Sequence, residues 1–186
     1  AREVSDSQGI SLGYRFPLRM AHDRSIYASF GLTHDRTQSE IAGIQFVDTK
    51  LNEMTAEVSY RRSIPLTEFG GTARLRMGSA KSAGGALTDG GYGVLQVSGF
   101  ANRRLSQGYA LTASLDGQMA SKLHLTVARQ FGVGGTEILR GYPSDVRAAP
   151  EAFALRLQVV QLDPWRVMNN RLAIQPYVFA DAAVLR

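Results

Sequence analysis

The stretch Tyr109–Ala120 reads YALTASLDGQMA, and apolar and polar side chains alternate along it. Successive side chains of a β-strand point to opposite faces, so a period of two predicts a strand with one apolar and one polar face. The apolar face would carry Tyr109, Leu111, Ala113, Leu115 and Met119, and the polar face Thr112, Ser114, Asp116 and Gln118.

The same alternation recurs on both sides and predicts strands at 10–16, 24–34, 54–61, 72–77, 95–102, 153–159 and 172–183, with Pro17 ending the first. The expected fold is all-β, with about eight antiparallel strands and no helix of consequence. Short links at 17–23, 63–71, 103–108 and 161–170 alternate with long ones at 35–50, 78–91 and 121–151. The middle of the first long link, Ile41–Val47, could extend a neighbouring strand above the bilayer. Outer-membrane barrels alternate short periplasmic turns with longer external loops, whereas a soluble sandwich has no reason to do so.

The two faces of the predicted strands suit the two sides of a membrane barrel wall. Most of the charged strand residues fall on the polar face. We expect the lumen to be lined by Arg74, Arg76, Ser114, Asp116, Gln118, Arg156 and Asp181. We expect the side chains that face lipid to be those of Leu111, Leu115, Met119, Leu155, Leu157, Ile174 and Val178.

Composition sets wider limits. The 186 residues are 44% hydrophobic and 20% charged, as in a folded domain, and they include no Cys that could form disulfides or thiolate metal sites. There is no apolar run of about 18 residues for a transmembrane helix. We expect no signal peptide at the start of the chain, because Arg2, Glu3 and Asp6 lie where an apolar run would be needed. The net charge of +5 comes mainly from scattered Arg residues, which does not favour a nucleic-acid partner.

Residues for catalysis or cofactor binding do not form a recognisable pattern. His22, His34 and His124 are far apart and lack metal-ligand spacing. The sequence has neither a nucleophile elbow nor a Walker loop. We therefore expect no enzyme activity, no catalytic residue, no metal and no cofactor.

The Gly-rich stretch 130–146 reads QFGVGGTEILRGYPSDV and interrupts the strand pattern. Gly134 and Gly135 permit backbone conformations that other residues avoid, and Leu139-Arg140-Gly141-Tyr142 follows them. The guanidinium of Arg140 presents a rigid fork of donors that suits a carboxylate. We predict a long loop that folds back and docks this one charged tip.

The string Phe-x-x-Gly-Gly-x-x-x-Leu-Arg-Gly-Tyr at 131–142 resembles the sixth-loop motif of the BamA-like outer-membrane superfamily. The closest resemblance is to the FhaC/ShlB-type transporters of two-partner secretion, also called haemolysin secretion/activation proteins. Stretches 115–120 and 175–181 are similar to the strand that enters the loop and the strand that carries its partner carboxylate. The resemblance is sharpest over 111–181.

This resemblance implies a sixteen-stranded barrel preceded by POTRA domains and a plug helix. Residues 1–186 would be a partial barrel domain, roughly the sixth to thirteenth strands, without the POTRA domains and the last strands. The implied function is a multi-pass pore in the outer membrane of a Gram-negative bacterium. It would secrete a partner exoprotein across that bilayer without ATP.

The resemblance also implies a partner for the loop. In the superfamily the loop Arg meets the acidic residue of a Phe-x-Asp-x-Gly motif, which Phe179 and Asp181 match while Ala183 replaces the Gly. A Glu that often follows the loop is replaced by Arg156. The pair Arg140–Asp181 is therefore expected to rest on one carboxylate, with a weaker or differently arranged docking.

Two other classes stay open at this point. A BamA-like insertase uses the same loop motif, and the number of upstream POTRA domains would separate it from a transporter. A soluble all-β module could present its Arg-rich strands to a polyanion, and it would need no detergent for extraction.

Overall fold

The computed structural model describes residues 3–41, 44–83, 90–105, 108–121, 129–135, 138–143, 147–167 and 172–186. Every element in these ranges is a strand, and no helix in them is long and apolar enough to cross a membrane. The main element is one antiparallel sheet in the order β1-β2-β3-β4-β5-β6-β9-β12. Its strands are β1 (Glu3–Met20), β2 (Arg24–Ile41), β3 (Ile44–Ile64), β4 (Thr67–Ala83), β5 (Gly90–Arg104), β6 (Tyr109–Ala120), β9 (Ala152–Gln161) and β12 (Tyr177–Leu185).

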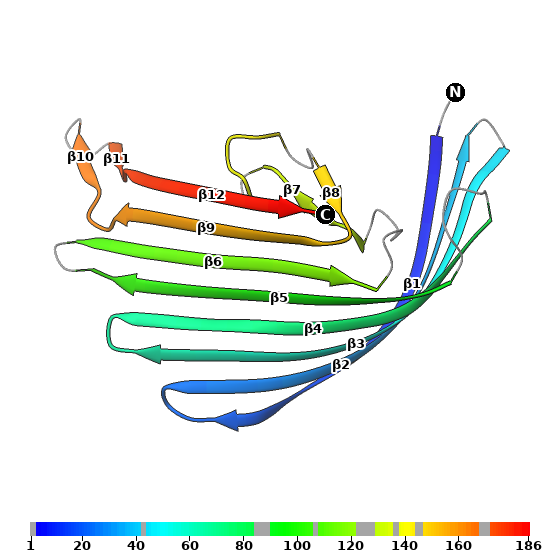
Figure 1. Cartoon of the computed structure of the whole chain (residues 1–186), viewed down its shortest axis with the longest axis horizontal. Coiled ribbons are helices and arrows are strands. Elements are labelled where there is room, and N and C mark those ends of the chain that lie inside the picture. Colours follow the sequence, from blue (N-terminus) through cyan, green and yellow to red (C-terminus); the bar gives the residue numbers. More distant parts are fainter. Residues whose placement is uncertain are drawn as a thin grey trace.

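The sheet is strongly curved, and β1 and β12 are its outermost strands (Figure 1). Two short hairpins accompany it. One pairs β7 (Phe131–Val133) with β8 (Arg147–Ala149), and the other pairs β10 (Trp165–Val167) with β11 (Leu172–Ile174). The prediction of an all-β, eight-stranded antiparallel fold is confirmed.

The strands are longer than the alternation predicts. β2 and β3 have 18 and 21 residues, and only 42–43 lie between them, so the predicted long link at 35–50 is wrong. The expected extension of a strand through Ile41–Val47 is confirmed at Ile41 and at 44–47. The link predicted at 78–91 is reduced to 84–89, which lies outside the described residues. The reason is that polar side chains also pair across strands: Arg36 binds Asp48, and the hydroxyls of Ser7 and Thr37 are 3.3 Å apart.

Three local predictions fail for identifiable reasons. β1 continues past Pro17 to Met20, through a register shift that an outermost strand tolerates. Gly70 and Gly71 lie inside β4 instead of in the preceding turn, which consists of residues 65–66. The predicted strand at 172–183 is broken at Gln175–Pro176, so Ile174 belongs to the β10–β11 hairpin and not to the main sheet.

Strand register separates the residues of the sheet into an apolar face and a polar face. Leu115 is opposite Leu155 on the apolar face, while Ser114 is opposite Arg156 on the polar face. Many large apolar side chains are exposed on the apolar face, among them Leu12 at 72%, Met54 at 59%, Met119 at 66% and Val178 at 70%. Nothing in the described chain covers that face.

The buried residues lie mostly on the other side of the sheet, around the loop. Val94 and Ala154 are each 1% exposed in the sheet, and Val133 is 2% exposed in β7. Gln118 of β6 is 2% exposed and Ala149 of β8 is 7% exposed. The packed region of this chain is therefore the contact between the β7–β8 segment and the polar face.

Candidate functional site

The segment around 131–149 forms a compact loop over the polar face. In its β7–β8 hairpin, Phe131 pairs with Ala149 and Val133 with Arg147. Gly134 and Gly135 follow with positive φ angles of 121° and 83°, which only Gly adopts readily. The Gly134 N–H donates to Ile138 O at 2.9 Å and the Gly135 N–H to Tyr142 O at 3.0 Å. The two glycines thus turn the chain sharply and bring the tip residues back over the hairpin.

The tip of the loop is a tight turn at 139–142. Leu139 has a φ of 57° and Gly141 a φ of 99°, and the Tyr142 N–H donates to Leu139 O at 3.3 Å. A Cβ on Gly141 would meet no atom within 4 Å, so the backbone conformation and not space requires Gly there. The Tyr142 side chain is exposed, and its described bonds come from its backbone. This turn presents Arg140 to the sheet.

Arg140 makes several contacts with one carboxylate. Its Nη2 donates to Asp181 Oδ1 at 2.7 Å, and its Nε donates to Asp181 Oδ2 at 2.9 Å. Its backbone N–H also donates to Oδ2 at 2.9 Å. The Asp181 side chain is only 4% exposed and that of Arg140 is 18% exposed, so the pair is largely shielded from water. Hydrogen bonding to the Asp181 carboxylate raises the pKa of Arg140, which keeps its charge permanent.

The neighbouring strands supply three further contacts. Arg140 Nη1 donates to the side-chain oxygen of Gln158 in β9, and Nη2 is 3.5 Å from Leu157 O. The guanidinium carbon lies 4.1 Å from the centre of the Phe179 ring, in a cation–π arrangement. The structure thus brings Arg140, Phe179 and Asp181 together, and it adds Gln158.

Arg156, which replaces the family's usual Glu, lies opposite Asp181 in the β9–β12 register. Its Nη2 also donates to Asp116 Oδ2 of β6 at 3.2 Å, so a second carboxylate on the same face offsets the like charge that Arg156 adds. One carboxylate does serve Arg140, but the amide of Gln158 supplies a further acceptor. Ala183, at the position of the family's Gly, is opposite the small Ala154, where the register leaves room for a methyl group.

Sequence reasoning missed a second group of contacts at the other end of the loop. Arg129 Nε is 2.8 Å from Glu53 Oε2 of β3, and the Tyr92 hydroxyl of β5 donates to the same oxygen at 2.6 Å. Glu53 is 6% exposed. Gln118 adds bonds from its Nε2 to Arg129 O at 2.9 Å and to Pro150 O at 3.1 Å. The available signal was the inward position of Glu53, which alternates with Met54 along β3.

The remaining predicted residues lie along the same polar face. Arg74 Nε donates to Glu57 Oε2 at 2.7 Å, and Gln96 Nε2 donates to Gln118 Oε1 at 2.8 Å. Arg76 lies beside this group, in a polar hollow that Glu53, Arg74 and Arg129 also line. Ser114 lines a smaller hollow with Arg140 and Arg156. The face is polar and largely internally paired.

The described residues contain no cluster of three or more His, Asp or Glu that could hold a metal ion. His34 bonds to Asn52, and His124 lies outside the described residues. The described contacts at this site are hydrogen bonds and ion pairs that hold a loop on the sheet.

Comparison with solved structures defines the class of fold. The chain superimposes on CdiB from Acinetobacter baumannii with a TM-score of 0.76 and 15% identity, over 99% of this chain and 33% of that one. For CdiB from Escherichia coli the TM-score is 0.78 and the identity 16%, over 97% of this chain and 35% of that one. Both are β-barrels, so the sheet has the fold of part of an outer-membrane-type barrel wall. The chain spans about a third of the length of these proteins.

Comparison with protein families is more specific. The model of the haemolysin secretion/activation proteins ShlB/FhaC/HecB matches residues 2–185. The chain belongs to this family, which confirms the resemblance drawn from the loop motif. A search of curated proteins finds no significant match.

Proposed function

We propose that this chain is part of the wall of a pore in the outer membrane of a Gram-negative bacterium, and that the pore secretes a partner exoprotein without ATP. Family membership supports this proposal, and the anchoring of Arg140 on Asp181 is the observation that carries it. The activity resides in the whole protein, of which this chain supplies strands and the inward loop. The protein is a transporter and not an enzyme, and its strands cross the bilayer several times.

The two faces of the sheet fit this placement. The apolar face would meet the lipid tails, because it exposes side chains such as Leu12, Met119 and Val178. The polar face would line the lumen, where ion pairs such as Arg74–Glu57 and Arg156–Asp116 keep it hydrated and internally balanced. An unfolded exoprotein could exchange backbone hydrogen bonds with water and with these side chains along the path. The residues Arg74, Arg76, Ser114, Asp116, Gln118 and Arg156 would form part of this path.

The loop would determine the shape of the lumen. One end of the loop is tied to β3 through Arg129 and Glu53, and its tip is tied to β12 through Arg140 and Asp181. Loop residues Gly134, Gly135, Leu139, Gly141 and Tyr142 would serve to present Arg140, and Phe179 would serve as the ring beneath it. The loop therefore occupies space that a passing chain needs, and secretion would require a change at one or both contacts.

The test is secretion by the whole protein with Arg140→Ala. We expect secretion of the partner exoprotein to be lost while the barrel still resists denaturation by detergent, because the strand ladders do not depend on the loop. Arg140→Lys should restore little, since an ammonium keeps the charge but loses the fork. Arg103→Ala, at an exposed position of β5 far along the chain from the loop, is the matched control. Normal secretion by Arg140→Ala would refute the proposed role of the loop.

A further inference from the structure

The apolar face of β2, β3 and β4 changes character at one level across all three strands. Three rows of cross-strand neighbours follow one another along these strands. The first row is Leu32, Met54 and Met77, the second is His34, Asn52 and Ser79, and the third is Arg36, Lys50 and Lys81. Large apolar side chains thus give way to neutral polar ones and then to three cations. If this face meets lipid, as the proposed function requires, the change marks the edge of the bilayer at the end of the strands where the long link 121–151 joins β6 to β9.

The third row concentrates positive charge. Lys50 lies directly opposite Arg36 on one side and Lys81 on the other, with Cβ atoms about 4.5–5.5 Å apart in such pairs. Like charges directly opposite each other destabilise a sheet. Arg36 is engaged with Asp48 through bonds of 3.1 and 2.8 Å. Lys50 and Lys81 are exposed, and no ion pair among the described residues includes either amine, although the Asp48 carboxylate attracts Lys50 from the next row.

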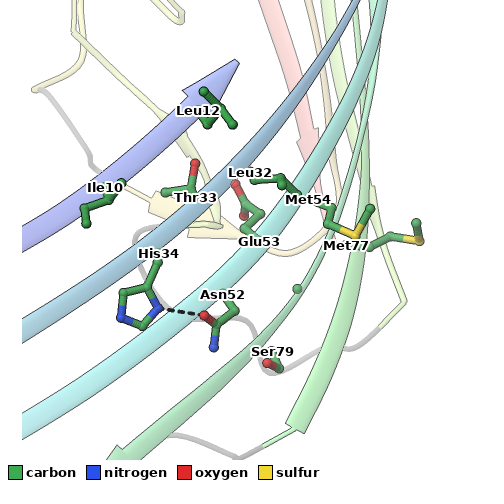
Figure 2. A pocket seen from close by; sticks show the side chains of 11 residues that line it. Ile10, Leu12, Leu32, Thr33, His34, Asn52, Glu53, Met54, Met77 and Ser79 are labelled. Carbon is green, nitrogen blue, oxygen red and sulfur yellow. Dashed lines mark hydrogen bonds between the residues drawn. The ribbon is translucent and has the colours of Figure 1, made fainter. Parts of the chain in front are cut away.

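An open apolar groove lies next to this cationic row. It has a volume of about 490 Å³ and is lined by Ile10, Leu12, Leu32, Met54 and Met77. Figure 2 shows these side chains on four neighbouring strands, with the His34 ring bonded to Asn52. That hydrogen bond, 2.7 Å from Nδ1 to Oδ1, forms the polar end of the groove on the side of the cations.

We propose that this site binds a phosphorylated lipid of the outer leaflet. The phosphate would lie over Lys50 and Lys81, where it offsets their mutual repulsion, while Arg36 stays paired with Asp48. An acyl chain of the same molecule would cover the apolar groove. A neutral or zwitterionic lipid would satisfy the groove but not the surplus charge, so charge complementarity selects the phosphorylated class.

The experiment measures binding of diphosphoryl lipid A to the whole protein in detergent, by native mass spectrometry. Dephosphorylated lipid A and inorganic phosphate are the comparison ligands. We expect the double variant Lys50→Gln/Lys81→Gln to bind the diphosphoryl lipid about thirtyfold more weakly. The matched control removes two exposed charges from the opposite end of β5, through Arg103→Gln/Arg104→Gln, and should bind as the unmodified protein does.

Each outcome bears on the proposal. Equal binding of the dephosphorylated lipid, or unchanged binding by the Lys variant, would overturn it. Inorganic phosphate binding as tightly as the lipid would also overturn it, by assigning the row to free phosphate. A secretion assay on the unmodified protein keeps the two proposals apart. Secretion without lipid binding by that protein would refute only the lipid site, whereas lipid binding without secretion would refute only the proposed function.

Discussion

The replacement Asp181→Ala removes the acceptor on which the loop tip rests. Three N–H groups of Arg140 donate to this carboxylate, at 2.9, 2.9 and 2.7 Å. After the replacement, the guanidinium keeps Gln158, Leu157 O and the ring of Phe179 as neighbours. The tip should therefore open more often without losing its place entirely.

The expected magnitude follows from the burial of the pair. Removing one partner of a buried ion pair costs about 3–5 kcal/mol. The Arg140 side chain is 18% exposed and keeps an amide acceptor, so we take a smaller cost of about 2–3 kcal/mol for docking the tip. At 1.4 kcal/mol for each factor of ten, local opening should become about 30- to 150-fold more frequent.

Amide hydrogen exchange measures this opening directly, because the N–H groups of the tip exchange with solvent only when the turn releases. The Arg140 amide itself donates to Asp181, and the Tyr142 amide to Leu139 O, so a peptide that covers 138–143 is the reporter. Asp116→Asn is the matched control, since it removes the carboxylate that serves Arg156 on the same face. Less than a threefold increase in exchange for Asp181→Ala, or an equal increase for the control, would refute the reasoning.

Three further variants test separate parts of the structure. Glu53→Gln should speed amide exchange near Arg129 by about tenfold, because it breaks the ion pair on β3. Exchange in the 138–143 peptide should stay nearly unchanged. Equal acceleration in both regions would contradict the inference that the loop is held by two separate contacts. Gly141→Ala should loosen the tip by about 1–3 kcal/mol through its φ of 99° alone, visible as faster exchange at 138–143; unchanged exchange would show that the turn has an alternative conformation. Leu115→Arg should lower the free energy of unfolding of the barrel in vesicles by about 2–4 kcal/mol, as measured with urea. Ser98→Arg, on the polar face opposite Asp116, should change this free energy little. The reverse order would show that the polar face, and not the apolar face, meets lipid.

The sequence predicted the fold best where the alternation of apolar and polar residues matches the alternating side-chain directions of a strand. The period of two along Tyr109–Ala120 predicts the strand and its faces, because the pleat alone determines them. The alternation did not predict how far strands continue once it fades, as in the pairing of Arg36 with Asp48, since cross-strand contacts sustain those ends. The motif pointed to Arg140 and Asp181, but Gln158 and Glu53 belong to strands distant in sequence, and register decides that they face the loop.

The two contacts of the loop have a consequence that neither has alone. Arg129 and Arg140 belong to one segment but bind carboxylates on different strands, so either contact can open while the other stays closed. Opening one contact costs less free energy than opening both, and the released part of the loop then moves about the contact that stays closed. With Arg140 released, the tip would leave β12 while Arg129 remains on β3; with Arg129 released, the reverse holds. Under the proposed function, one such opening would make room for a passing chain, and the loop would clear the lumen as a hinged flap and would not be expelled. The hinge would then lie at the contact whose loss reduces secretion more. Glu53→Gln removes the contact on β3 and Asp181→Ala removes the contact on β12, so comparing secretion by these two variants identifies the hinge.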